Sequence, residues 1–271
     1  MQCVCLLAIV VAPASPGWAN SELRPAARLV FPYYDIRPGT NTILLVTNVS
    51  HVPTTAQLTF YDVSCLKTGF NVLLSGKDIA ALDLSRLLGD RAPEAFKQGF
   101  VDLVAGQNSL VGAATIWNLL EDWAIGYHPA AAQRLSGPVP FETFPTRLAL
   151  PGFFTGVEGA RRLDGLLILL APNPTLPGGP IGDEAVQAEF DVFAPPGGSR
   201  SLAATGHQLL LPLSFFAPRA PGSRVAWLTV RNAALDDQRQ RLGLVGLFIQ
   251  TLVDPGGGGG MAGAIRLWGL P

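Results

Sequence analysis

Few residues of this chain have the types and spacing that chemistry requires. The three histidines, His51, His128 and His207, are far apart, and no two of them have the spacing of metal ligands. His207 occupies the turn position that Lys77 holds in an earlier, similar stretch, so we expect a solvated turn residue there. No Gly-x-Ser-x-Gly motif nominates a nucleophile. We therefore predict no catalytic residue, no cofactor and no metal site, and a protein that is not an enzyme.

Carboxylates give two further candidates, and neither pattern is specific. Glu121–Asp122 precedes Trp123, an arrangement that could place acids beside a sugar-stacking ring, although a polar turn is the simpler interpretation. Three other acids lie near the ends of expected strands and could meet as calcium ligands: Asp35, Asp62 and Asp83. They lack the Asp-x-Asp-x-Asp spacing of a calcium loop, so the sequence does not predict such a site.

Aromatic residues supply the candidate contact surface. Trp117 and Trp227 lie within apolar runs, and we expect them in the core. Trp123 and Tyr127 lie in the less regular segment 118–128, followed directly by His128. Exposed together, these three side chains would form a patch for a partner protein or a glycan.

Composition excludes several classes of protein. The chain has 271 residues, of which 48% are hydrophobic and 14% are charged, so it can build a core and is not globally disordered. The formal net charge of −1 gives no basic excess for nucleic acid. No integral membrane segment is expected in the mature chain, because the apolar run at Cys5–Ala12 is too short to span a bilayer comfortably.

Residues 1–19 have the pattern of a signal peptide. The apolar run Cys5–Ala12 is followed by Gly17-Trp18-Ala19, which offers small residues at the cleavage positions. Export to the periplasm, the cell surface or the medium is therefore predicted. Cys65 would be the single cysteine of the mature chain, which leaves no intramolecular disulfide.

The chain repeats itself over roughly a hundred residues. Arg28–Tyr34 parallels Arg147–Phe153, and Ala56–Asp62 parallels Val186–Val192, with further matched runs in the same order. A repeat of this length indicates a duplicated domain. We predict a signal peptide at 1–19, a first module at 20–128, a linker at 129–146 and a second module at 147–271.

Strands dominate both modules. Gln57–Tyr61 alternates polar and apolar residues, whereas Leu166–Leu170 is a continuous apolar run that fits a strand covered on both faces or lying between the modules. A turn or two of helix is expected within Leu84–Phe96, capped by Asp83 or Ser85. Short strands at about ten-residue spacing predict an all-β fold of two tandem, duplicated β-sandwich modules packed together.

Residues 29–118 resemble exported bacterial proteins with an immunoglobulin-like β-sandwich module. The resemblance rests on Phe31–Tyr34, Leu44–Ser50, Leu58–Asp62 and Leu110–Ile116, and it covers the second module only in outline. It implies immunoglobulin-like modules and no activity, since a shared fold does not carry a function with it.

Together these observations predict a non-catalytic structural or interaction module, of the adhesion or assembly type. Its partner would be another protein or a second copy, engaged through exposed edge strands. The alternative is a carbohydrate- or small-ligand-binding module or a hydrolase, with its site near Trp123 and Tyr127 or between the modules.

Overall fold

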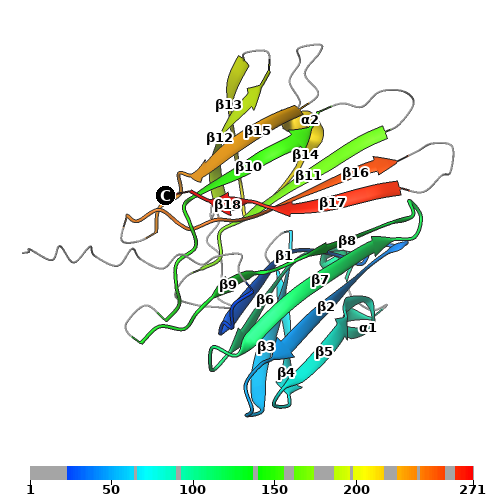
Figure 1. The fold of residues 1–271 in the computed structure, drawn as a ribbon, viewed down its shortest axis with the longest axis vertical. Coiled ribbons are helices and arrows are strands. Elements are labelled where there is room, and N and C mark those ends of the chain that lie inside the picture. The colour runs from blue at the N-terminus through cyan, green and yellow to red at the C-terminus, as the bar shows by residue number, and fades with distance from the viewer. Residues whose placement is uncertain are drawn as a thin grey trace, which may run out of the picture.

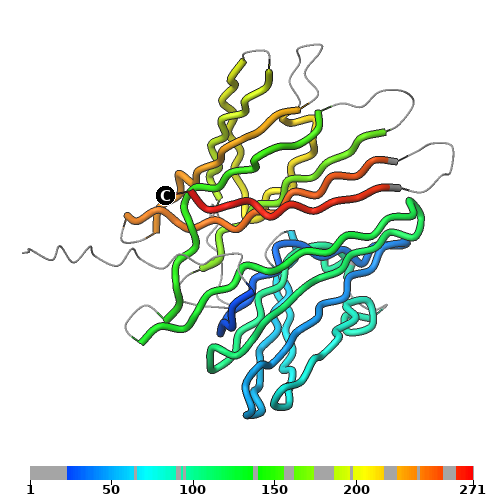
Figure 2. The backbone as a smooth tube through the Cα atoms, in the orientation of Figure 1, coloured from blue at the N-terminus to red at the C-terminus, as the bar shows by residue number. Residues whose placement is uncertain are grey.

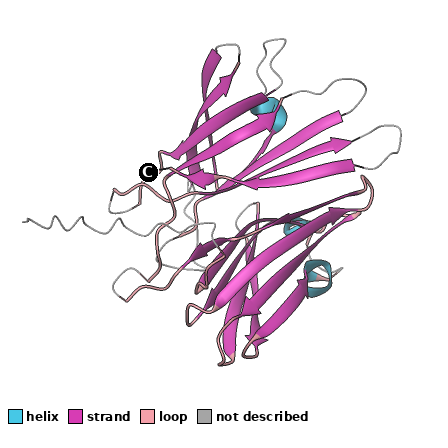
Figure 3. Cartoon of the chain, in the orientation of Figure 1, coloured by secondary structure: helices cyan, strands magenta, loops and turns pink. Residues whose placement is uncertain are grey.

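The computed structural model describes residues 23–270 except for nine short internal segments, 64–65, 90–92, 137–139, 156–161, 174–185, 196–197, 217–224, 237–238 and 254–259. The predicted signal peptide at 1–19 and Cys65 lie outside these residues. The described chain is dominated by strands, as predicted (Figure 3). It forms a first half, β1 to β9, and a second half, β10 to β18, seen as the lower and upper parts of Figure 1.

The first half contains two antiparallel sheets. Sheet I has the order β4-β3-β6-β1-β9, and these strands span Lys67–Leu74, Thr54–Asp62, Gln98–Ala105, Arg28–Asp35 and Ala130–Ala132. Sheet II has the order β5-β2-β7-β8, and these strands span Asp78–Asp83, Thr40–Asn48, Leu110–Asn118 and Trp123–Tyr127. The segment predicted as a linker, 129–146, thus contributes β9 to sheet I.

The second half repeats this pattern of pairing. Sheet III has the order β13-β12-β15-β10-β18, and these strands span Gly198–Gly206, Val186–Ala194, Val225–Asn232, Arg147–Phe154 and Trp268–Gly269. Sheet IV has the order β14-β11-β16-β17, and these strands span Gln208–Pro212, Arg162–Leu170, Val245–Val253 and Gly260–Arg266. Figure 2 follows the chain through the two halves, from blue to red.

Short helices occur where the fifth strand of each half ends. Helix α1 spans Leu84–Leu88, and the Asp83 side chain caps it by accepting a hydrogen bond from the backbone N–H of Arg86, as expected. A 3-10 helix, η1, spans Glu94–Lys97. Helix α2 spans Leu213–Phe216 directly after β14.

The prediction of two tandem immunoglobulin-like sandwich modules is wrong. The chain forms four small sheets, and their strand orders differ from the immunoglobulin pattern, in which the third, sixth and seventh strands share a sheet. Here the seventh strand, β7, pairs with β2 and lies in a different sheet from β3 and β6. The first strand, β1, pairs with β6. A four-bladed propeller also has four small sheets. In this chain, each sheet includes neighbouring strands that do not follow one another in the sequence. The sequence pattern predicted where strands form but not which strands pair.

The four sheets are joined through shared cores. Ile168, Leu247 and Ile249 of sheet IV belong to the same apolar cluster as the inner faces of sheets I and II. Tyr61, Phe100 and other residues on the opposite face of sheet I belong to the core cluster of the second half. The second half of β11 is therefore covered on both faces, which confirms the interpretation of Leu166–Leu170 as a buried run.

Candidate functional site

The three residues predicted as a contact patch do not form one. Tyr127 is 6% exposed, and its hydroxyl donates a hydrogen bond to the carbonyl oxygen of Tyr33. Burial raises the pKa of the Tyr127 hydroxyl well above its usual value. His128 is exposed, with its Nδ1 3.3 Å from the carbonyl oxygen of Gly112. A ring buried in the core cannot join an exposed histidine in a binding surface.

Trp123 takes part in the contact between the two halves. Its Nε1 donates to Glu121 Oε2 at 3.0 Å, and Glu121 Oε1 accepts from Arg162 Nη2 of β11 at 2.7 Å. The hydrogen bond from Trp123 and the contact with Arg162 hold the pKa of Glu121 below its usual range. Glu121 and Trp123 therefore connect the first half to the second, and the acid-and-ring sugar site considered from the sequence does not take shape here.

The contact between the halves is filled by other side chains as well. Arg266 Nη1 donates to the carbonyl oxygen of Pro129 at 2.8 Å, and burial lowers the pKa of this arginine to about 10. Gln208 Nε2 donates to the carbonyl oxygen of Pro32 at 3.0 Å. These hydrogen bonds join the two halves in the region considered as the alternative location of a ligand site.

The acidic side chains considered as metal ligands have other partners in the structure. Among those residues, no three His, Cys, Asp or Glu side chains come together as metal ligands would. Asp35 instead accepts hydrogen bonds from Arg37 and Thr40, and Asp83 caps α1. In the same part of the chain, no helix is long and apolar enough to cross a bilayer.

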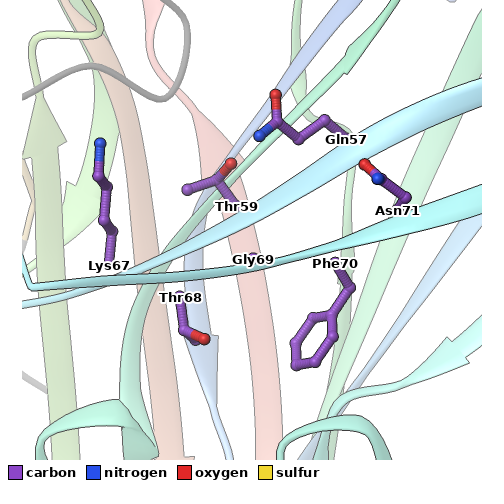
Figure 4. Close-up of a pocket in the computed structure, with 7 residues that line it drawn as sticks. All are labelled: Gln57, Thr59, Lys67, Thr68, Gly69, Phe70 and Asn71. Carbon is purple, nitrogen blue, oxygen red and sulfur yellow. The ribbon is translucent and has the colours of Figure 1, made fainter.

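A shallow hollow of about 360 Å³ lies on β3 and β4 (Figure 4). In that view Gln57, Thr59, Lys67 and Asn71 lie on one side of β4, and Phe70 points to the other side. Amide and hydroxyl groups there could bind a polar ligand. Phe70 is the one aromatic residue of its lining and Lys67 the one charged residue, so the hollow is a weaker candidate than the surface described next.

A stacked pair of aromatic rings marks the outer face of sheet I, the face turned away from sheet II. Tyr61 of β3 and Phe100 of β6 are cross-strand partners whose ring centroids are 4.5 Å apart, with an interplanar angle of 4°. Each ring is 2% exposed. They are covered because this face of sheet I is built into the second half's core.

Arg28 and Asp102 extend this covered face. Arg28 Nε and Nη2 donate to the two oxygens of Asp102 at 2.9 and 2.8 Å, and both side chains are almost fully buried. The guanidinium carbon of Arg28 lies 5.8 Å from the ring centroid of Phe141 and 6.0 Å from that of Phe144, two residues of the segment between the halves. Arg28 Nη1 also donates to the carbonyl oxygen of Asn173 at 2.6 Å. The part of this face that carries Arg28, Tyr61, Phe100 and Asp102 is therefore an interface inside the molecule.

Sheet III has the matching face in the second half, and there it is open. Phe193 of β12 and Trp227 of β15 hold the strand positions of Tyr61 and Phe100, and they stack in the same way. Their centroids are 5.9 Å apart and their planes 13° apart. Trp227 is 42% exposed, so its predicted place in the core is wrong.

Further apolar side chains lie on the same face of sheet III, together with the polar residues Arg147, Asp191 and Thr229. The set that we call the sheet III outer face comprises Phe154, Phe193, Val225, Trp227 and Trp268. Trp268 is 61% exposed and Phe154 is 56% exposed. Exposed aromatic side chains gathered on one surface are typical of protein-binding sites.

Alternation in β15 was the signal that could have revealed this surface. Ala226, Leu228 and Val230 are buried, while Val225 and Trp227 point the other way. Because Val225 and Trp227 are themselves apolar, the start of the run resembles a strand covered on both sides. The run itself does not show that its outward face is exposed, whereas the equivalent residues of sheet I are buried against the second half.

Comparisons with known proteins add little. No protein-family model matches the chain, and no curated protein matches it. One similar solved structure is the crystal structure of Thermotoga maritima 1070, with 14% identity and a TM-score of 0.32, covering 38% of this chain and 92% of that chain. A likeness this distant carries no argument about fold or function. None of these findings supports the predicted signal peptide, secretion or immunoglobulin-like modules.

Proposed function

We propose that this chain is a non-catalytic interaction protein that docks another protein on the sheet III outer face. The observation that carries the proposal is the pairing of two equivalent faces with opposite exposure. Tyr61 and Phe100 are covered on sheet I, whereas Phe193 and Trp227 form the same cross-strand stack in an open position on sheet III. The first pair shows how this chain covers such a face with protein.

The chemistry of the face favours a protein partner over a small ligand. The aromatic side chains lie on the surface of a sheet, and the polar hollow described above belongs to β3 and β4 of the first half and not to this face. Flat aromatic surfaces bury area against a complementary surface, and Trp is among the residues that contribute most to protein binding. The ion pair of Arg231 with Glu189, half-exposed at the border of this set, fits a polar rim.

Site-specific photocrosslinking in the cells that make the protein tests this proposal. A photoreactive benzoyl-phenylalanine replaces Trp227 in one variant and Leu119 in a control. Leu119 is a matched control because it is an apolar side chain, 77% exposed, in the turn after β7. We expect a covalent protein adduct from position 227 and none from position 119. Irradiation that gives no adduct at 227, or equal adducts at both positions, would refute docking at this face.

A further inference from the structure

We infer that the partner on the sheet III outer face is a second copy of this chain, docked head to tail through the end of its first half. This inference rests on the proposed function and names its partner. The docking would repeat, between two molecules, the contact that the second half makes with the first half inside one molecule.

The internal contact uses identifiable elements of the second half. Gln208, the first residue of β14, donates to the carbonyl oxygen of Pro32 on β1. Asn173, three residues after β11, accepts the hydrogen bond from Arg28. The end of β11 and the start of β14 therefore lie over sheet I, beside the core that covers Tyr61 and Phe100.

Sheet III presents the same features to a second molecule. The strand pair β1 and β6 shifts register between Phe31 and Tyr34, and the pair β10 and β15 shifts between Leu150 and Phe153. Proline stands inside both shifts, as Pro32 on β1 and Pro151 on β10. Pro32 receives Gln208, whereas Pro151 is exposed. Among the described residues, the receiving surface thus exists twice and is occupied on sheet I alone.

The first half also carries the counterpart of the docking elements. Gln208 pairs with Leu170, the last residue of β11, and Ile79 pairs with Thr47 near the end of β2. Ile79 thus holds the place of Gln208 in the first half, and it is 65% exposed. Three exposed apolar residues on neighbouring turns and strands form what we call the first-half end: Val52 at 60%, Leu73 at 72% and Ile79 at 65% exposure.

The positions of the two surfaces fit head-to-tail association. Figure 1 has the long axis vertical, with β12 and β13 toward the top and β4 and β5 toward the bottom. A contact between two different surfaces at opposite ends leaves both surfaces free on the outer molecules. Such a heterologous contact adds further copies and forms open chains, whereas a contact of one surface with itself stops at a dimer.

A mixing experiment with two purified variants tests the inference. Trp227→Asp disrupts the sheet III outer face and leaves the first-half end intact, and Ile79→Asp does the reverse. We expect the average mass of the wild-type chain, from sedimentation velocity, to rise with concentration past the dimer. Each variant alone should associate roughly thirtyfold or more weakly than the wild type, because an aspartate replaces an apolar contact residue in the interface.

The equimolar mixture decides between the modes of association. The intact face of the Ile79→Asp chain can receive the intact end of the Trp227→Asp chain, so the mixture should form dimers and nothing larger. Wild-type behaviour of Ile79→Asp alone would overturn the inference in favour of face-to-face pairing. A wild-type chain that stays monomeric, or a mixture that stays monomeric, would also overturn it. Leu119→Asp serves as the control that associates normally, and circular dichroism verifies that every variant is folded.

The two proposals fail separately. A monomeric wild-type chain combined with an adduct of position 227 to a different protein would overturn self-association and leave docking at this face standing. The absence of any adduct at position 227 and of any self-association would overturn both.

Discussion

At the residue scale, Asp35 shows two opposing effects on one carboxylate. The residue is 4% exposed, and this burial by itself raises its pKa. Hydrogen bonds from the side chain and backbone N–H of Arg37 and from the Thr40 hydroxyl outweigh burial and hold the pKa below its usual range. Asp35 thereby fixes the turn that leads from β1 into β2.

The lowered pKa gives a signed prediction for stability against pH. The folded-state pKa of Asp35 lies below the unfolded value of about 3.9, so its stabilisation is present above that pH and is lost as the pH falls through the folded-state pKa. We expect Asp35→Asn to destabilise the protein by about 1–3 kcal/mol near neutral pH and to flatten the fall in stability below about pH 4.

Thermal unfolding measured from neutral to acid pH tests this, with Asp122→Asn as the control. Asp122 is an exposed turn residue with a φ of 51°, a conformation that asparagine also accepts. The control should follow the wild-type curve. An Asp35→Asn curve parallel to that of the wild type would show that Asp35 does not link stability to pH.

Equivalent positions on the outer faces of sheets I and III carry different residues. Asp102 on β6 pairs with Arg28 under cover of the second half, and Thr229 holds the corresponding position on β15. Arg147 is the counterpart of Arg28 on β10. Burying an arginine there without a carboxylate partner would be costly, and Arg147 is in fact exposed. The residues on each face therefore match its cover: a buried ion pair on sheet I and a solvated arginine on sheet III.

At the element scale, two glycines show how closely the sheets approach. A Cβ on Gly112 would lie 2.9 Å from Leu29 Cδ1 and 3.0 Å from Phe31 Cζ. A Cβ on Gly246 would lie 3.0 Å from Leu148 Cδ1, and Leu148 is the counterpart of Leu29. The seventh strand of each half thus uses glycine to let the first strand pack against it.

We expect Gly112→Ala and Gly246→Ala each to lower the free energy of unfolding by about 1–3 kcal/mol, because the added methyl overpacks a buried contact. Gly263→Ala in β17 is the control, since a Cβ there meets no atom within 4 Å. The control should be neutral or stabilising by up to about 1 kcal/mol, as alanine costs less entropy than glycine in a strand. Denaturant titration gives these values. Equal effects at all three positions would contradict the close approach.

Much of the strand pattern could be predicted from the sequence, and the pairing could not. The matched runs Arg28–Tyr34 and Arg147–Phe153 do form strands, because alternation and turn residues are local signals. The partner of β7 is set by contacts distant in sequence, so the immunoglobulin-like topology was wrong. Tyr127 was missed because β8 is short, although its alternation with Ile125 marks an inward face. Trp227 was misplaced because an exposed apolar face and a covered one have the same pattern.

At the scale of the whole molecule, sheet IV connects the two cores. Leu167 and Leu169 face the core of the second half, while Ile168 between them belongs to the core cluster of the first half. Each of these side chains is 0% exposed. A strand with both faces buried makes the packing of each half depend on the other. The two halves are therefore not independent domains, and we expect them to unfold as one unit.

Ile168→Ala tests this dependence, because it removes side-chain volume from the second half at a point where that half fills the first-half core. We expect a loss of about 2–5 kcal/mol in the free energy of unfolding. Native-state hydrogen exchange should show protection lost in β2 and β7 of the first half as well as in β11 and β16, since one cooperative unit opens. The exposed Phe154 supplies the control, and Phe154→Ala should leave exchange in both halves unchanged. If Ile168→Ala reduced protection in β11 and β16 alone, the halves would be independent units, and the contact that the head-to-tail model copies between molecules would be weaker than the shared core implies.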